Sequence, residues 1–209
     1  MKNFAFCLLF IFSCYSCFSQ TYKVLEDKEA FQKLYIEKAK NIVSLESKFV
    51  QEKSISFLEK KLISEGTFQF RKPSMLRMEY TKPFQYLFIL NNDRVIIKSN
   101  SHETNISTNS NKVFKIISQI TVDCVSGNVF NNKNFKSTIL ENNDSYLITL
   151  VPSATDIKSI MNEIKVIISK ADYTVVKLEM VETSGDFTIL VFKDKEINKT
   201  IPDASFTGK

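Results

Sequence analysis

The sequence predicts a mainly β protein with helices (α+β), in which helices cover a single curved antiparallel sheet. Apolar and polar residues alternate in segments such as Gly66–Phe70 and Leu76–Tyr80, as in strands with one buried face. Two other segments have apolar residues at helical spacing, and short polar turns join the later strands. No linker rich in Pro, Gly or Ser divides the chain, so we expect one domain over residues 20–209.

Two long helices are predicted, each with a single apolar face that needs a sheet to cover. The first extends over about residues 28–43 with Asp27 as its N-cap. Its apolar stripe consists of Ala30, Phe31, Leu34, Tyr35, Ala39 and Ile42. The second extends over about residues 112–125, and Gly127 is its C-terminal stop. Its stripe consists of Val113, Phe114, Ile116, Ile117 and Ile120. A short third helix is expected within residues 155–163.

Strands are expected on both sides of the second helix. Pro73 and Pro83 end two of the early strands. In these strands Phe68, Phe70, Leu76, Met78 and Tyr80 should share one face of the sheet, with Gln69, Arg77 and Glu79 on the other. The remaining predicted strands are residues 86–90, 94–98, 103–108, 135–140, 146–151, 164–168, 174–181 and 187–193.

Residues 1–19 have the pattern of an export signal. Lys2 supplies a positive charge, residues 4–12 form an apolar run too short to span a bilayer, and residues 13–19 are small or compact. We expect cleavage after Ser19 and a periplasmic location. Two alternatives stay open, namely a buried N-terminal helix and a lipid anchor on Cys14 or Cys17. Cleavage would leave Cys124 as the one cysteine, which excludes an internal disulfide.

The composition favours apolar binding surface over catalysis. The chain has 18 Phe, no Trp and one His, and its net charge of +5 is spread along the sequence. Spread charge argues against nucleic acid as a partner. No phosphate loop, zinc spacing or dinucleotide fingerprint occurs, so we expect no cofactor, no metal and no enzymatic activity. We expect His102 in an exposed polar loop and Cys124 as a buried apolar residue.

Several short motifs occur in a fixed order along the chain. Phe49-Val50-Gln51 opens a strand, and a later strand begins at Gly66 and ends in Arg71-Lys72-Pro73. The strand Leu76–Tyr80 then precedes Pro83, and further on come Gly185-Asp186 and the Ile-x-Asp-x-x-Phe pattern of residues 201–206. In this order and spacing the chain resembles the periplasmic outer-membrane lipoprotein carriers, the LolA family.

The resemblance implies an incomplete β-barrel whose mouth is plugged by helices, in a monomeric carrier of acyl chains. Its partners would be acylated lipoproteins, an inner-membrane release complex and an outer-membrane acceptor. The helix at residues 112–125 would be the lid. The expected cavity residues are Phe49, Phe68, Phe70, Leu76, Met78, Tyr80, Phe88, Leu90, Phe114 and Ile117. For any one of them taken singly, ordinary core packing is the more common explanation.

Lid control is expected from the basic pair Arg71 and Lys72. The family commonly has Arg directly before the first Pro, where it is thought to hold the lid closed, and this chain has Lys72 there. Lys can donate hydrogen bonds but lacks the planar fork of Arg. The usual Trp is also absent, with Met78 in its place, and Asn92-Asp93 replaces the usual Asp-Gly turn.

These features lead to three alternative functions. A shuttle would take acylated lipoproteins from the inner to the outer membrane. A binding module of the same fold would sense lipid or lipoprotein without handover. An envelope enzyme would need His102, and it ranks last.

Overall fold

The computed structural model describes residues 21–58, 60–92, 94–99, 102–107 and 112–208, and leaves the side chains of residues 102–107, 112–118 and 131 undescribed. The expected export signal thus lies outside the described residues. Twelve strands form one antiparallel sheet in the order β1-β8-β9-β10-β11-β12-β2-β3-β4-β5-β6-β7. Strands β2 to β7 therefore form the middle and one wing of the sheet, and β8 to β12 form the other wing, with β1 at its edge.

The early strands are β1 (Lys23–Val24), β2 (Ser44–Ser54), β3 (Leu62–Arg71), β4 (Met75–Lys82), β5 (Tyr86–Asn91), β6 (Arg94–Ser99) and β7 (His102–Ser107). The later strands are β8 (Phe135–Glu141), β9 (Ser145–Pro152), β10 (Met161–Ser169), β11 (Val175–Glu182) and β12 (Phe187–Ile197). The helices are α1 (Lys28–Lys40), α2 (Lys112–Ser126) and α3 (Thr155–Lys158), with short 3₁₀ turns η2 (Asn128–Asn131) and η3 (Asp203–Phe206).

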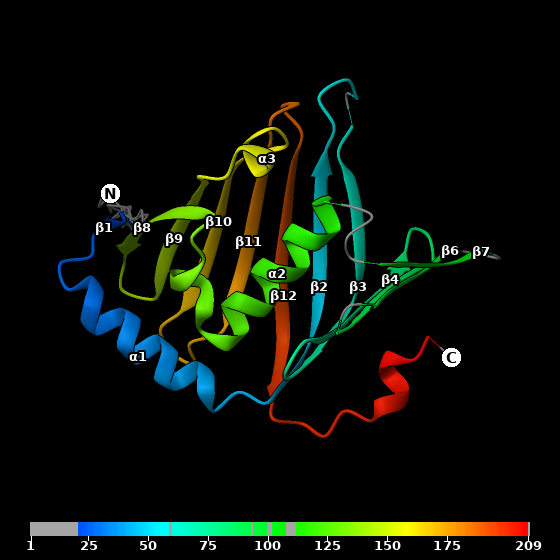
Figure 1. Cartoon of the computed structure of the whole chain (residues 1–209), viewed down its shortest axis with the longest axis horizontal. Helices are drawn as coiled ribbons and strands as arrows, with labels where there is room; N and C mark the ends of the chain where they lie inside the picture. Colours follow the sequence, from blue (N-terminus) through cyan, green and yellow to red (C-terminus); the bar gives the residue numbers. More distant parts are fainter. Residues whose placement is uncertain (1–20, 59, 93, 100–101, 108–111, 209) are drawn as a thin grey trace, which may run out of the picture.

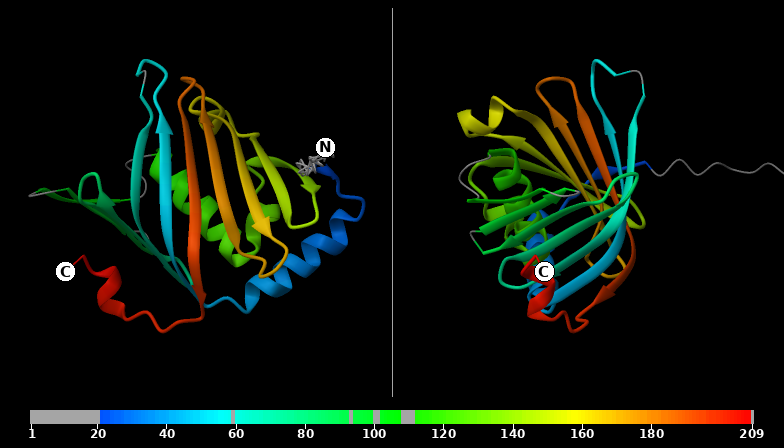
Figure 2. Two further views of the ribbon diagram at one scale, coloured as in Figure 1. Left: turned by 180° about the vertical axis from the view of Figure 1, so that it is seen from behind. Right: turned by 90° about the vertical axis from the view of Figure 1, so that its right-hand side faces the viewer.

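The sheet is open and curved, and α1 and α2 lie on its concave side (Figure 1). Viewed from the side, the strands wrap around the two helices, while η3 lies on the outside, against the wing formed by β4 to β6 (Figure 2). The predicted fold class is confirmed: an α+β protein with one curved antiparallel sheet that does not close into a barrel.

The alternation predicted for β3 and β4 is confirmed by burial and register. Phe68 pairs with Met78 and Phe70 with Leu76, and all four side chains are buried on the concave side. The intervening Gln69 and Arg77 pair with each other and are half-buried on the convex side. The strands end before Pro73 and Pro83, both of which follow cis peptide bonds.

The predicted helix starts and stops are mostly correct. The side chain of Asp27 accepts a hydrogen bond from the Ala30 backbone N–H at 2.9 Å, which confirms the N-cap. Helix α2 ends at Ser126, and Gly127 follows with φ +79°, a left-handed conformation that favours glycine.

Helix α1 ends three residues before the predicted position. The prediction of residues 28–43 was wrong at its end because Val43, just before β2, makes its hydrogen bonds to residues outside the helix. Its N–H donates to the Asn198 side chain at 2.8 Å, and its carbonyl accepts from the Lys72 N–H at 2.9 Å. His102 likewise begins strand β7 and does not lie in a loop; its side chain lies outside the description.

The sheet has a separate apolar core on each face. The large cluster fills the concave side under α1 and α2. A smaller one on the convex side joins Ile89 and Ile96 to Ile201 and Phe206 of the C-terminal segment. The concave face is therefore the one that carries the broad apolar surface.

Candidate functional site

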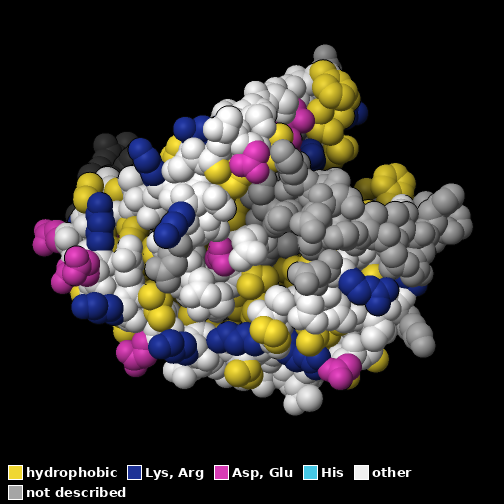
Figure 3. Space-filling view, in the orientation of Figure 1, with side chains coloured by type: hydrophobic (Ala, Val, Ile, Leu, Met, Phe, Trp, Pro, Cys, Tyr) yellow, Lys and Arg dark blue, Asp and Glu magenta, His cyan; other side chains and the backbone are white. Residues whose placement is uncertain are grey.

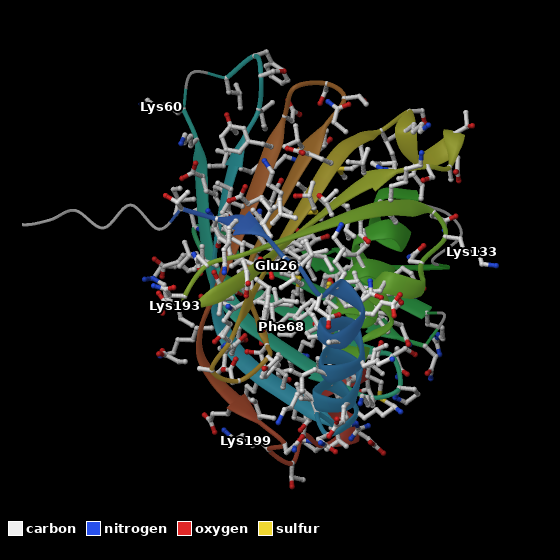
Figure 4. All side chains as sticks on the ribbon, turned by 90° about the vertical axis from the view of Figure 1, so that its left-hand side faces the viewer. Glu26, Lys60, Phe68, Lys133, Lys193 and Lys199 are labelled. Carbon is white, nitrogen blue, oxygen red and sulfur yellow. The ribbon has the colours of Figure 1, made fainter. Side chains whose placement is uncertain are left out.

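Seven of the ten residues predicted to line a cavity come together in the concave core. They are 9% exposed or less and belong to one cluster: Phe49, Phe68, Phe70, Leu76, Met78, Phe88 and Leu90. Tyr80 is partly buried and packs against this cluster. Phe114 and Ile117 lie in α2, and their side chains are outside the description. Phe68 lies in the interior, on the side of the sheet that the helices cover (Figure 4).

The other half of the sheet supplies an equal share of this surface, and the prediction did not include it. Strands β9 to β12 contribute Ile148, Leu150, Ile164, Val166, Leu178, Met180 and Leu190 to the same cluster. Period-two alternation in these strands could have identified them, because Leu178 and Met180 show the same spacing as Phe68 and Phe70. We call the whole concave apolar surface, formed by β2 to β6 and β8 to β12, the floor.

A small cavity lies between the floor and α2. Its volume is about 30 Å³, and it is lined by Leu45, Phe68, Thr121, Cys124, Val125, Val175, Leu178 and Phe192. By the same measure a cavity needs roughly 10–15 Å³ to hold one water molecule. The cavity is therefore far too small for an acyl chain, and a chain could lie on the floor only if α2 moved away from it.

The two long helices are joined to each other. The Tyr35 hydroxyl on α1 donates a hydrogen bond to the Cys124 carbonyl of α2, and burial raises the pKa of Tyr35 well above its usual value. Gly127 allows close approach, since a Cβ there would lie 3.0 Å from the Ala39 Cβ. The helices thus form one unit over the floor, which we call the cover.

Lys72 links the cover to the turn between β3 and β4. Its Nζ donates to the carbonyl oxygens of Ala39 at 2.8 Å and Lys40 at 3.0 Å, in the last turn of α1. Helix C-termini carry unpaired carbonyls and partial negative charge, so an ammonium group is favourable there. Desolvation lowers the pKa of Lys72. The helix that Lys72 contacts is α1, whereas the predicted lid is the helix at residues 112–125.

Arg71 has a different set of contacts. Its guanidinium donates to the Ile201 carbonyl at 2.6 Å, forms an ion pair with Asp203 and lies 5.2 Å from the centre of the Phe206 ring. These three residues are the fixed positions of the Ile-x-Asp-x-x-Phe pattern. The two sequence motifs therefore meet on the convex side, where Arg71 holds the C-terminal segment to the sheet.

One end of the floor is marked by polar and aromatic groups. The Tyr80 ring lies 4.9 Å from that of Phe49 and 5.4 Å from that of Tyr86, and its hydroxyl donates to Gln51 at 2.8 Å. Burial raises the pKa of Tyr80. A second pocket of about 270 Å³ opens here, lined by Glu79, Tyr80, Thr81, Gln85, Tyr86, Leu87 and Lys98.

Exposed apolar side chains gather at the same end. Phe57 at the β2–β3 hairpin tip is 82% exposed, and Phe84 at the β4–β5 turn is 75% exposed. Figure 3 shows apolar groups at these two places on the molecular surface. This end of the half-barrel therefore presents apolar side chains to whatever approaches the floor.

The Cys124 thiol at the site is not suited to catalysis. Burial raises the pKa of the Cys124 thiol, which makes it a poor nucleophile. Among the described residues, no group of three or more His, Cys, Asp and Glu could hold a metal ion. Across the same part of the chain, no helix is long and apolar enough to cross a bilayer.

The model of the family described as "Outer membrane lipoprotein carrier protein LolA" matches residues 40–209. The chain belongs to the LolA family. No curated protein matches it in sequence.

Solved structures show likeness at low sequence identity. An uncharacterised conserved protein from Thermus thermophilus has a TM-score of 0.50 at 10% identity, covering 86% of this chain and 93% of that one. The LolA superfamily protein NE2245 from Nitrosomonas europaea has a TM-score of 0.43 at 12% identity, with 84% and 97% covered. The MucA/MucB complex of Pseudomonas aeruginosa gives 0.49 at 8% identity, with 85% and 60% covered. The Thermus structure supports the fold and nothing beyond it.

Proposed function

We propose that this LolA-family protein is an exported carrier that binds the acyl chains of lipoproteins on the floor, beneath the cover. It would receive them at the inner membrane and deliver them to the outer membrane through the periplasm. The observation that carries the proposal is a broad apolar sheet face covered by a helix pair that Lys72 holds at one end. Family membership is consistent with this, since the family is described as lipoprotein carriers.

The free energy of burying an acyl chain is large enough for the chain to replace part of the cover on the floor. Each methylene removed from water contributes roughly 0.8 kcal/mol, so a chain of about fifteen methylenes gains up to about 12 kcal/mol. Uncovering the floor costs the burial of α2 side chains such as Ile120 and Val125, which is worth roughly 1.5–3 kcal/mol each. An acyl chain can thus displace part of the cover, and the cover can displace the chain again once an acceptor takes it.

Lys72 and the end of the floor near Phe57 and Phe84 have separate parts in this proposal. Lys72 stabilises the closed state, in which the cover fills the floor. The end near Tyr80 is where the peptide part of a lipoprotein would leave the floor, because a pocket opens there beside the exposed apolar tips. In this proposal Arg71 takes no part in lid control, because its guanidinium binds the C-terminal segment.

Loading and handover can be tested separately with a tripalmitoylated cysteinyl peptide and the same peptide without acyl groups. The protein should retain the acylated peptide through gel filtration and should not retain the other. Acceptor vesicles carrying an outer-membrane extract should then remove the peptide. Retention without removal would favour the sensing module, and failure to retain the acylated peptide would exclude both.

A lack of handover would not be evidence for an enzymatic function. An envelope enzyme that used His102 would turn over substrate whether or not the floor binds acyl chains. Replacing His102 by Ala should leave peptide retention unchanged.

A further inference from the structure

Ser47 presents a buried hydroxyl group in the middle of the floor. Its side chain is 2% exposed, and among the described residues Ser47 Oγ is the one buried side-chain nitrogen or oxygen without a hydrogen-bond partner. A buried hydroxyl that makes no hydrogen bond destabilises the folded protein. The position of such a group in a binding surface therefore needs an explanation.

The neighbours of Ser47 are residues that line the small cavity. Leu45 is two residues before it on the same face of β2, and Phe68 is directly opposite on β3. On the other side, Phe192 of β12 pairs with Phe49, the next residue of β2 on this face. The hydroxyl is thus surrounded by the part of the floor that α2 covers.

The backbone beside Ser47 is irregular, and the cavity nearby is apolar. Strand β12 carries a register shift between Lys193 and Glu196, next to Ser47, where a bulge locally disturbs the pairing of the strands. Apart from Thr121, the cavity is lined by apolar side chains and a cysteine. A water molecule in that cavity would find too few of the two to four polar partners it requires, and Ser47 itself does not line the cavity.

We infer that Ser47 Oγ donates a hydrogen bond to the carbonyl oxygen of an ester- or amide-linked acyl chain bound on the floor. The inference rests on the proposed function and names the ligand chemistry of that site. A purely apolar floor would bind any chain of the right length. One donor among apolar side chains would favour chains that carry a carbonyl acceptor, because only these satisfy the hydroxyl.

The test compares Ser47→Ala with Ser44→Ala in protein expressed from the full chain. Ser44 is three residues away on the convex face, and its hydroxyl donates to the Lys199 carbonyl at 2.6 Å. Binding of methyl palmitate and of octadecane is measured by displacement of a fluorescent apolar probe. Urea unfolding of the empty proteins is measured in parallel.

Ser47→Ala should weaken methyl palmitate binding about fivefold, which is the value of one hydrogen bond, and leave octadecane binding unchanged. It should also raise the urea midpoint of the empty protein, whereas Ser44→Ala should lower it. Equal effects on the two ligands, no effect on either, or a lower midpoint for Ser47→Ala would overturn the inference. Wild-type protein that binds neither ligand would overturn the proposed function as well.

Discussion

The ammonium group of Lys72 lies 2.8 Å from the carbonyl oxygen of Ala39, and this contact joins the turn after β3 to the last turn of α1. Arg71, one residue earlier, points to the other side of the sheet and binds the C-terminal segment. A single basic pair therefore holds two different elements, one over each face. Only the Lys72 contact bears on opening the floor.

Replacing Lys72 by Leu should make the cover open more often. Loss of the two hydrogen bonds to the α1 carbonyls costs roughly 1 kcal/mol, or about a fivefold larger open population. Cys124 lies on the side of α2 that faces the floor and is 2% exposed, so its alkylation by a maleimide, followed by peptide mass spectrometry, reports opening. We expect faster alkylation, with acylated peptide loaded but released slowly because the closed state competes less well for the floor.

Lys82→Leu is the matched control for this change. Lys82 is an exposed lysine on the neighbouring strand, paired with Glu65 at 3.0 Å and distant in sequence from α1. It should leave both alkylation and release unchanged. Identical alkylation rates for Lys72→Leu and the wild type would remove Lys72 from lid control.

Tyr35 should make stability sensitive to alkaline pH. Burial raises its pKa above that of the unfolded chain, which is about 10. The folded state therefore holds the proton after the unfolded state has lost it, so this stabilisation is present below about pH 10 and declines above it. Tyr35→Phe should lose roughly 1 kcal/mol at pH 8, for the hydrogen bond to Cys124, and a smaller difference from the wild type should be seen at pH 11.

The measurement is urea unfolding at the two pH values, with absorbance of tyrosinate followed in the same samples. Tyr22→Phe serves as the comparison, because the Tyr22 hydroxyl pairs with Ser145 at the margin of the fold. A Tyr35→Phe deficit that is as large at pH 11 as at pH 8 would contradict the argument.

Two buried phenylalanines on opposite faces of the sheet allow an effect on ligand binding to be distinguished from an effect on the free energy of unfolding. Phe68 is 2% exposed in the floor, and Phe206 is 0% exposed in the convex cluster. Truncation of either to Ala should cost about 3–5 kcal/mol of unfolding free energy. Only Phe68→Ala enlarges the cavity beneath α2, so it alone should change the affinity for an acyl probe. Equal changes in probe affinity for the two variants would show that the floor is ordinary core.

Gly66 is expected to tolerate no side chain. A Cβ there would lie 2.1 Å from the Glu79 carbonyl oxygen and 2.8 Å from the Phe49 ring. Because backbone must shift to make room, Gly66→Ala should destabilise the protein by about 3 kcal/mol. Thermal unfolding checks this against Thr67→Ala at the neighbouring exposed position. A loss for Gly66→Ala no greater than that for Thr67→Ala would mean that the strands separate easily here.

Much of the fold could be predicted because its signals are local. Alternation in β3 and β4 assigned Phe68, Phe70, Leu76 and Met78 to one face, and the capping residue Asp27 placed the start of α1. The end of α1 could not be predicted from the helical spacing of Ile42. It was decided by Asn198, whose side chain binds the Val43 N–H from 155 positions away.

The candidate site, too, could be predicted in part from the sequence and was decided in part only by the tertiary structure. The sequence by itself determined which side chains are apolar, how they alternate, and that the order of motifs is that of a lipoprotein carrier. Only the tertiary structure decided that Lys72 reaches Ala39 while Arg71 reaches Ile201, and that Ser47 is buried without a partner. The physical reason is that side-chain direction follows from the local period of a strand, whereas the identity of a partner depends on how the whole sheet curves and brings distant segments together.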